Sequence, residues 1–327
     1  MSLTLAALCA AATSALLPIV LVDNGSKRAA AALTLRESAT ALSRHLGGRE
    51  VLTASLAFSD SIPAAELGGV RARTLNETLL ALNAQGSPGA VVAPLFLGQS
   101  GGLRRTLDAC AATLAERSSG SCAFELRVGA CLVDDEAPHD DRVARALASH
   151  VLRVARRAQL LRAPASALRV VVCDHGTPSR RVHAVRQRLE AEVRELLGAR
   201  VASVCSASME RREGEAYDFN EPLLERCLRR APYDAGEVVV AMAFLLPGRH
   251  AGEGGDVAQI VQSAQQDAAQ GACGGGGPAA EPPPLRVHVT PPLATHPSTI
   301  AVLADRVRAA DAAAPMALRT AARGERT

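Results

Sequence analysis

Two histidines stand directly after apolar runs of the kind that form buried strands. His175 follows one run in "RVVVCDHGTPSR", from residue 169, and His250 follows another in "VVVAMAFLLPGRHAGEGGD", from residue 238. If both runs are parallel strands of one sheet, their carboxyl ends meet at the edge where such sheets bind ligands. A single histidine in this position is usually a turn residue, whereas two on one edge favour a shared site. Because imidazole titrates near neutrality and binds iron, cobalt and nickel, we expect a base or a metal ligand at each position.

Three further polar residues are expected at the same edge of the sheet. Glu253 is the nearby carboxylate that we expect to complete the site or to relay protons, and Asp256 is better explained as the N-cap of the helix that follows it. His296, in "LATHPSTI", follows the last strand-like run and is either a second-tier site residue or the start of a helix.

The elements that must position these residues occur twice. "PIVLVDNGSKRAA" from residue 18 matches "LRVVVCDHGTPSR" from residue 168, so that Asp23 pairs with Asp174 and Gly25 with Gly176. Three more pairs keep the same order: "NETLLALN" at 76 with "NEPLLERC" at 220, "VVAPLFLG" at 91 with "VVAMAFLL" at 239, and "LRVGACLVDD" at 126 with "LRVHVTPPLATH" at 285. The chain is therefore predicted to be a tandem repeat.

Within each copy, short valine-rich runs alternate with longer segments of helical periodicity. This alternation predicts an α/β fold of two similar lobes, each a mainly parallel sheet flanked by helices. We place the first lobe at 18–160 and the second at 168–315, with the connector "LLRAPASA" at 160–167. The Gly- and Pro-rich stretch 268–284 is expected to be a flexible insertion in the second lobe. The polar stretch 208–225 is expected either to cover the cleft or, better explained, to be a surface loop.

Composition excludes several classes of function. The 327 residues are 48% hydrophobic and 21% charged, with 2% aromatic residues, no tryptophan and a net charge of +3. Neither a base-stacking platform nor a basic stripe is present, so we expect no nucleic-acid partner, and no internal run is long and apolar enough for a membrane span. The eight cysteines form no C-x-x-C pair, which predicts reduced thiols without a zinc site or an iron–sulfur cluster, in a reducing compartment such as cytoplasm or plastid. Residues 1–17 resemble the apolar part of a signal peptide but lack its basic start, and their cleavage stays open.

The sequence resembles the CbiX/SirB chelatases, which insert cobalt or iron into sirohydrochlorin. The resemblance rests on "CDHGT", "FLLPGRHAGEGGD" and "VTPPLATHPSTIAVLADRV" in this order, and two tandem copies extend it over nearly the whole chain. It implies two α/β lobes facing each other across a cleft, with one metal-binding histidine after the first strand and another in the Gly-rich turn. Carried over by position, these are His175 and His250.

The implied reaction suits these residues. Insertion of a divalent metal into a tetrapyrrole releases two pyrrole protons, which requires a base, and the ion must be held by few ligands so that it can be passed on. The metal, cobalt or iron, is thus a substrate, as is sirohydrochlorin. Guanidinium groups could bind the substrate's carboxylates, although each is also explained as solvated surface charge: Arg249, Arg180, Arg211 and Arg212. A chain that holds both lobes is compatible with a monomer.

The first copy lacks the key side chains, since Asn24 stands at the position of His175 and Gly102 at that of His250. We therefore expect the N-terminal half to form a wall of the cleft. Two alternatives stay open. The first is a non-catalytic tetrapyrrole- or metal-binding protein of the same fold. The second is a serine hydrolase that uses Ser100 in "GQSGG", a G-x-S-x-G turn between a strand and a helix, with Asp134 or Asp135 and His139 downstream.

Overall fold

The computed structural model describes residues 16–117, 124–134, 139–160, 168–272 and 283–317. Most of the N-terminal segment, the predicted connector between the copies and the centre of the Gly- and Pro-rich stretch lie outside the described residues. No helix in the described part of the chain is long and apolar enough to cross a membrane.

Two four-stranded sheets confirm the predicted fold class. The first has the order β2-β1-β3-β4, and the second has the order β6-β5-β7-β8, with all pairings parallel. The strands are β1 (Ile19–Asp23), β2 (Val51–Ser55), β3 (Gly89–Pro94), β4 (Glu125–Val128), β5 (Arg169–Asp174), β6 (Ser203–Ser208), β7 (Glu237–Met242) and β8 (Arg286–Val289). The register repeats as well, because Asp23 lies beside Ser55 and Asp174 beside Ser208.

Eight α-helices accompany the sheets in the described ranges: α1 (Ala29–His45), α2 (Leu75–Ala84), α3 (Gly101–Arg117), α4 (Arg142–Arg157), α5 (Arg180–Leu197), α6 (Leu224–Cys227), α7 (Asp256–Ala272) and α8 (Pro297–Ala312). Local signals set several of their starts. Thr74 and Glu77 form a capping box at α2, and His296 caps α8, which has Pro297 in its first turn.

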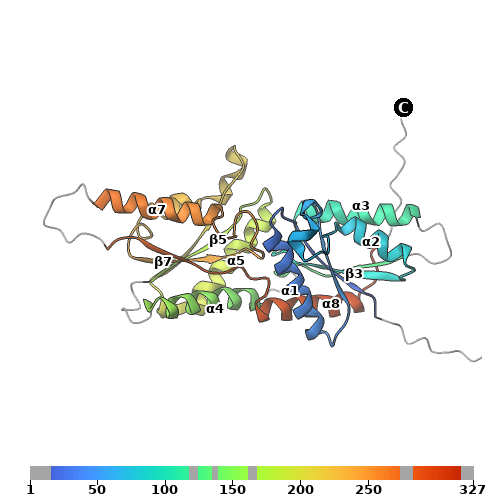
Figure 1. Cartoon of the computed structure of the whole chain (residues 1–327). Helices are drawn as coiled ribbons and strands as arrows, with labels where there is room; N and C mark the ends of the chain where they lie inside the picture. Colours follow the sequence, from blue (N-terminus) through green and yellow to red (C-terminus); the bar gives the residue numbers. More distant parts are fainter. Residues whose placement is uncertain (1–15, 118–123, 135–138, 161–167, 273–282, 318–327) are drawn as a thin grey trace, which may run out of the picture.

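The last helix of each half packs on the sheet of the other half. Helix α4 contacts β7 and α5, whereas α8 contacts α1, β3 and β4. Both helices lie along the same side of the molecule, and α3 and α7 lie on the opposite side (Figure 1). One continuous apolar core joins α1, α4, α5 and α8 to one face of each sheet, for example through Leu42, Leu147, Leu189 and Leu303. The division into lobes at 18–160 and 168–315 stays a prediction. In the folded chain, the last helix of each of these units packs on the sheet of the other unit.

Candidate functional site

The two predicted histidines meet at the carboxyl edge of the second sheet. Strands β5 and β7 are neighbours, so the residues that follow them start side by side. His175 comes directly after β5, and the turn after β7 brings back His250, so that the two ring centroids lie 4.5 Å apart with the planes tilted by 59°. The side chain of His175 is 47% exposed and that of His250 is 29% exposed, which leaves both rings open to a ligand.

A carboxylate orients His250. Oδ2 of Asp256 lies 2.6 Å from Nδ1 of His250, and both side chains are about 30% exposed. Asp256 is the first residue of α7, and the turn that contains Gly252 and Gly255 folds the chain back so that the carboxylate reaches a ring six positions earlier. A carboxylate on Nδ1 holds the proton there and leaves Nε2 as the free ligand atom, as in metal sites that use histidine.

Glu210, which the sequence analysis missed, pairs with His175. Its Oε1 lies 3.2 Å from Nε2 of His175, while Nδ1 of the same ring lies 3.1 Å from the carbonyl oxygen of Gly176. A carbonyl only accepts, so this contact places the proton on Nδ1. Nε2 then directs a lone pair at the carboxylate unless the ring is doubly protonated. A cation between Nε2 and Oε1 satisfies both atoms.

The repeat shows why the first half has no equivalent site. Gly25 and Gly176 both have φ +91°, and a Cβ would lie 1.7 Å from the carbonyl oxygen of Ala57 in the first turn and 1.9 Å from that of Glu210 in the second. Ala57 is therefore the structural counterpart of Glu210. The first half has lost the acidic partner as well as the two histidines.

Buried polar contacts hold the His175 turn from below. The Asn220 side chain is fully buried and joins the backbone N–H and the carbonyl of Thr177 by two hydrogen bonds of 2.9 Å. Asp174 accepts a hydrogen bond from Ser208 at 2.8 Å and faces Arg186 at 3.5 Å. In the first half, burial raises the pKa of the equivalent carboxyl, Asp23. The turn that carries His175 thus rests on a network of buried polar side chains, Asp174, Ser208, Arg186 and Asn220.

The other predicted site residues do not contact the histidine rings in the described part of the chain. Glu253 is exposed and makes no ion pair or hydrogen bond there. Arg249 is 76% exposed and lies 3.7 Å from Asp256, close to the site. The remaining arginines contact the 208–225 stretch: Arg180 lies over the Phe219 ring, Arg212 over the Tyr217 ring, and Arg211 pairs with Asp218 and Glu221. Arg211 is thus already neutralised, whereas Arg249, Arg180 and Arg212 keep exposed guanidinium groups.

His296 has a structural role. Its Nδ1 accepts a hydrogen bond of 3.1 Å from the N–H of Ser298, which caps α8. Its ring packs edge-on against His150 of α4, with centroids 5.0 Å apart, and burial lowers the pKa of both imidazoles, that of His150 to about 4. The pair joins the two exchanged helices and stays uncharged near neutrality.

Ser100 likewise caps a helix. Its Oγ accepts a hydrogen bond of 3.2 Å from the N–H of Leu103 in the first turn of α3. His139 is exposed, and no contact in the described ranges links it to Ser100. The geometry thus gives the nucleophile-elbow hypothesis no base.

Turns from the two halves meet near the histidines. A Cβ on Gly248 would lie 3.3 Å from Oγ of Ser26, and one on Gly98 would lie 2.9 Å from the Val185 side chain of α5. Arg181 donates to the Gln99 side chain across the same boundary. The site therefore lies where the carboxyl edges of the two sheets face each other.

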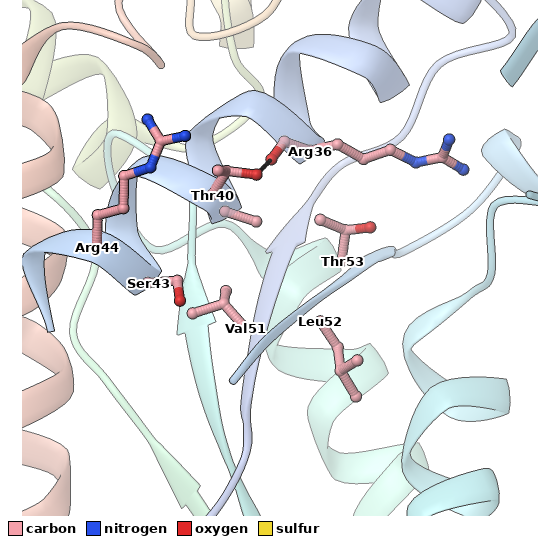
Figure 2. A pocket seen from close by; sticks show the side chains of 8 residues that line it. Arg36, Thr40, Ser43, Arg44, Val51, Leu52 and Thr53 are labelled. Atoms are coloured by element: carbon pink, nitrogen blue, oxygen red, sulfur yellow. Dashed lines mark hydrogen bonds between the residues drawn. The ribbon is translucent and has the colours of Figure 1, made fainter. Parts of the chain in front are cut away.

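A pocket of 410 Å³ lies elsewhere, between α1 and the edge strand β2. Its lining includes Thr40, Ser43 and Thr53, and the side chains of Arg36 and Arg44 point away from each other (Figure 2). The Arg36 guanidinium is bound to the carbonyls of Leu67 and Val70. No convergent set of charged or metal-binding groups faces this pocket, and it shares no residue with the histidine site.

Within the described residues, no three His, Cys, Asp or Glu side chains form a ready metal cage. The site instead offers two imidazole–carboxylate pairs side by side. A complete cage retains its ion, whereas an open set of few donors permits transfer.

Comparison with known proteins finds a family model that matches much of the C-terminal half. The CbiX family model matches residues 169–310, which confirms the resemblance inferred from the sequence. A search of curated proteins finds no significant match.

Solved structures share the fold over most of the chain. SirB from Bacillus subtilis with Fe³⁺ and the sirohydrochlorin chelatase SirB from subspecies spizizenii in complex with cobalt are each 16% identical, with TM-scores of 0.59 and 0.60. The match covers 90% of this chain and 95% of each SirB chain. CbiX, the terminal enzyme for siroheme biosynthesis in denitrifying bacteria, is 17% identical with a TM-score of 0.50, over 90% of this chain and 99% of that one. At these identities the likeness shows the two-lobed chelatase fold.

Proposed function

We propose that this chain, whose residues 169–310 belong to the CbiX family, inserts cobalt or iron into sirohydrochlorin. The observation that supports this most strongly is the 4.5 Å approach of the His175 and His250 rings, each with its own carboxylate partner. The same imidazole and carboxylate donors accept both metals, so availability decides between them.

Each imidazole–carboxylate pair has a distinct part in the reaction. Asp256 fixes the proton of His250 on Nδ1, so that Nε2 is the atom that receives the metal. His175 and Glu210 lie with Nε2 and Oε1 3.2 Å apart and can hold either the incoming cation or a proton from the tetrapyrrole. Two pairs match the two pyrrole protons that leave when the metal enters.

The rest of the cleft orients the tetrapyrrole. Arg249, Arg180 and Arg212 present exposed guanidinium groups for the substrate's carboxylates. Glu253 stays a candidate proton relay at the solvent side of the turn. The N-terminal half supplies the opposite wall, since Ser26 approaches the Gly248 turn and neither Asn24 nor Gly102 can act as a base.

The test is insertion by purified protein. We expect Co²⁺ or Fe²⁺ to enter sirohydrochlorin faster with the protein than in buffer alone. The change in the absorption spectrum of the tetrapyrrole measures this rate. His175→Ala and His250→Ala should each lower the rate by about 10²–10⁴-fold, the usual contribution of a positioned acid or base. Circular dichroism should show both variants folded, because exposed turn residues contribute little stability.

Asn24→Ala is the matched control, because Asn24 occupies the position of His175 in the other half. Its rate should stay within a few-fold of the parent. Insertion no faster than the uncatalysed rate, together with tight binding of sirohydrochlorin, would replace the enzyme by a binding protein of the same fold.

A further inference from the structure

Two thiols face each other in the half of the chain that carries the histidines. Cys205 lies in the middle of the edge strand β6, Cys227 is the last residue of α6, and their sulfur atoms are 3.6 Å apart. Cys205 is partly exposed, whereas Cys227 is 5% exposed. Cys205 is therefore the more accessible thiol of the pair.

The environment distinguishes the two sulfur atoms. The hydrogen bond from the Cys227 thiol lowers the pKa of Cys205, and Tyr233 supplies a second hydrogen bond in the same direction. The same contact and burial raise the pKa of Cys227. Neighbouring Cys173 is fully buried, which raises its pKa well above the usual value. Cys205 is the thiol with the most thiolate character in this group.

The pair belongs only to the half that keeps the histidines. By the register of β2 and β6, Leu52 occupies the position of Cys205. Ser55 pairs with Thr74 as Ser208 pairs with Leu223, and the helices that follow start at Leu75 and Leu224, so that Thr78 occupies the position of Cys227. The first half, which lacks the site's side chains, lacks the thiols as well.

The thiols bracket the segment that positions His175. Residues 209–223 run between β6 and α6 and carry Glu210, whose N–H donates to the His175 carbonyl at 3.2 Å. Asn220, in the same segment, holds Thr177 by two hydrogen bonds. At its base, Ser208 pairs with Leu223. A bond between Cys205 and Cys227 would close a covalent ring around this segment.

We propose that Cys205 and Cys227 form a reversible disulfide by exchange with a low-molecular-weight disulfide such as oxidised glutathione, and that this bond restrains residues 209–223. The disulfide itself is independent of the proposed function. Only the inference that restraining Glu210 affects a metal ion held beside His175 rests on that function. The sulfur atoms must move from 3.6 Å to the covalent distance of about 2.05 Å, a shift that side-chain rotation and a small movement of α6 can supply.

The chemistry proceeds in two exchanges. The Cys205 thiolate attacks one sulfur of the small disulfide, whose S–S bond breaks and releases one small thiolate, which takes up a proton. The Cys227 sulfur, after giving its proton to solvent, then attacks Sγ of Cys205 and releases the second small thiol. Two protein thiols are oxidised by two electrons in total, and one small disulfide is reduced to two thiols.

The experiment incubates the full chain in glutathione buffers of increasing oxidised fraction, alkylates the remaining thiols under denaturing conditions and maps the peptides by mass spectrometry. We expect Cys205 and Cys227 to lose alkylation together as one linked peptide pair, reversibly with reductant, while Cys110 and Cys173 stay alkylated. Cys227→Ser should stop at a glutathione adduct on Cys205. Cys205→Ser should leave Cys227 unmodified, because that thiol is buried.

Hydrogen exchange measures the restraint without any metal or tetrapyrrole. Amide exchange in residues 209–223 should slow on oxidation of the parent and not of Cys227→Ser. Thiols that stay reduced in excess oxidised glutathione, a stable glutathione adduct on Cys205 of the parent, or a link to another cysteine would each overturn the disulfide. Unchanged exchange in 209–223 of the linked protein would overturn the restraint. Failure of metal insertion alone would count against the proposed function and leave the disulfide standing.

Discussion

Replacing Asp256 by Asn isolates the charge that orients His250. The carboxylate lies 2.6 Å from Nδ1, a charge-assisted hydrogen bond. Such bonds contribute about 1.5–3 kcal/mol, which corresponds to roughly 10–150-fold in rate if the contribution is realised in the transition state. Because both partners are about 30% exposed, screening by solvent places the expected loss at the lower end, about 10–30-fold.

Asp256 is the first residue of α7, so Asp256→Asn should keep the helix intact and lose no more than about 1 kcal/mol of the helix-dipole interaction. Initial rates of Co²⁺ insertion, Co²⁺ titration and thermal melts separate the two effects. Glu253→Gln provides the comparison, since Glu253 lies in the same turn without contacting His250 in the described structure. Insertion and Co²⁺ binding by Asp256→Asn that match the parent would refute the assignment of Asp256 as the orienting carboxylate, whereas a large loss for Glu253→Gln would support Glu253 as the proton relay.

Three more expectations follow from the geometry. Gly176→Ala and Gly25→Ala should each lower the free energy of unfolding by more than about 2 kcal/mol in chemical denaturation, because both residues have φ +91° and an added Cβ would clash with a carbonyl oxygen. Only Gly176→Ala should also reduce insertion in the protein that remains folded. Ser100→Ala should cost about 1 kcal/mol of stability through the lost cap and leave insertion unchanged. Labelling of Ser100 in the parent by a fluorophosphonate would instead support the hydrolase. His150 has a folded-state pKa of about 4 against 6.5 when unfolded, so stability should fall by up to about 3 kcal/mol as the pH drops from 6.5 to 4. His150→Gln should flatten this dependence in denaturation series across that range, and an unchanged slope would contradict it.

The positions of the two histidines were predictable because they depend on local pattern. A buried valine run followed by Asp, one residue and Gly occurs twice, and the carboxyl ends of parallel strands must share an edge. Once the repeat is recognised, the pairing of β5 with β7 follows, and with it the approach of His175 to the turn that holds His250.

The acidic partners were not predictable from the same pattern. Glu210 follows an edge strand without a motif of its own, and its approach to His175 depends on the register of β6 against β5, which tertiary pairing sets. A signal was present in the repeat. Aligning Ser55 with Ser208 makes Ala57 the counterpart of Glu210, which is a third position where the first half lacks the side chain of the site. Asp256 was expected chiefly as a cap, because the sequence of the glycine-rich turn does not indicate the chain reversal that brings Asp256 to His250.

The exchange of α4 and α8 explains why the N-terminal half is needed although it lacks the site's side chains. Helix α4 lies in the N-terminal half and packs Val143, Leu147 and Val151 into the core that covers Val170, Val172 and Val239 of the second sheet. Exposing three such valines costs about 1.5–3 kcal/mol each, a sum comparable with the net stability of an ordinary domain, about 5–15 kcal/mol. Helix α8 makes the reciprocal contact with the first sheet, fixed by the Arg49–Asp311 ion pair at 2.6 Å. In the N-terminal half, Asn24, Ala57 and Gly102 stand where the other half has His175, Glu210 and His250, and this difference leaves the helix–sheet contacts intact. Loss of the whole N-terminal half would instead expose the sheet that carries the two histidines.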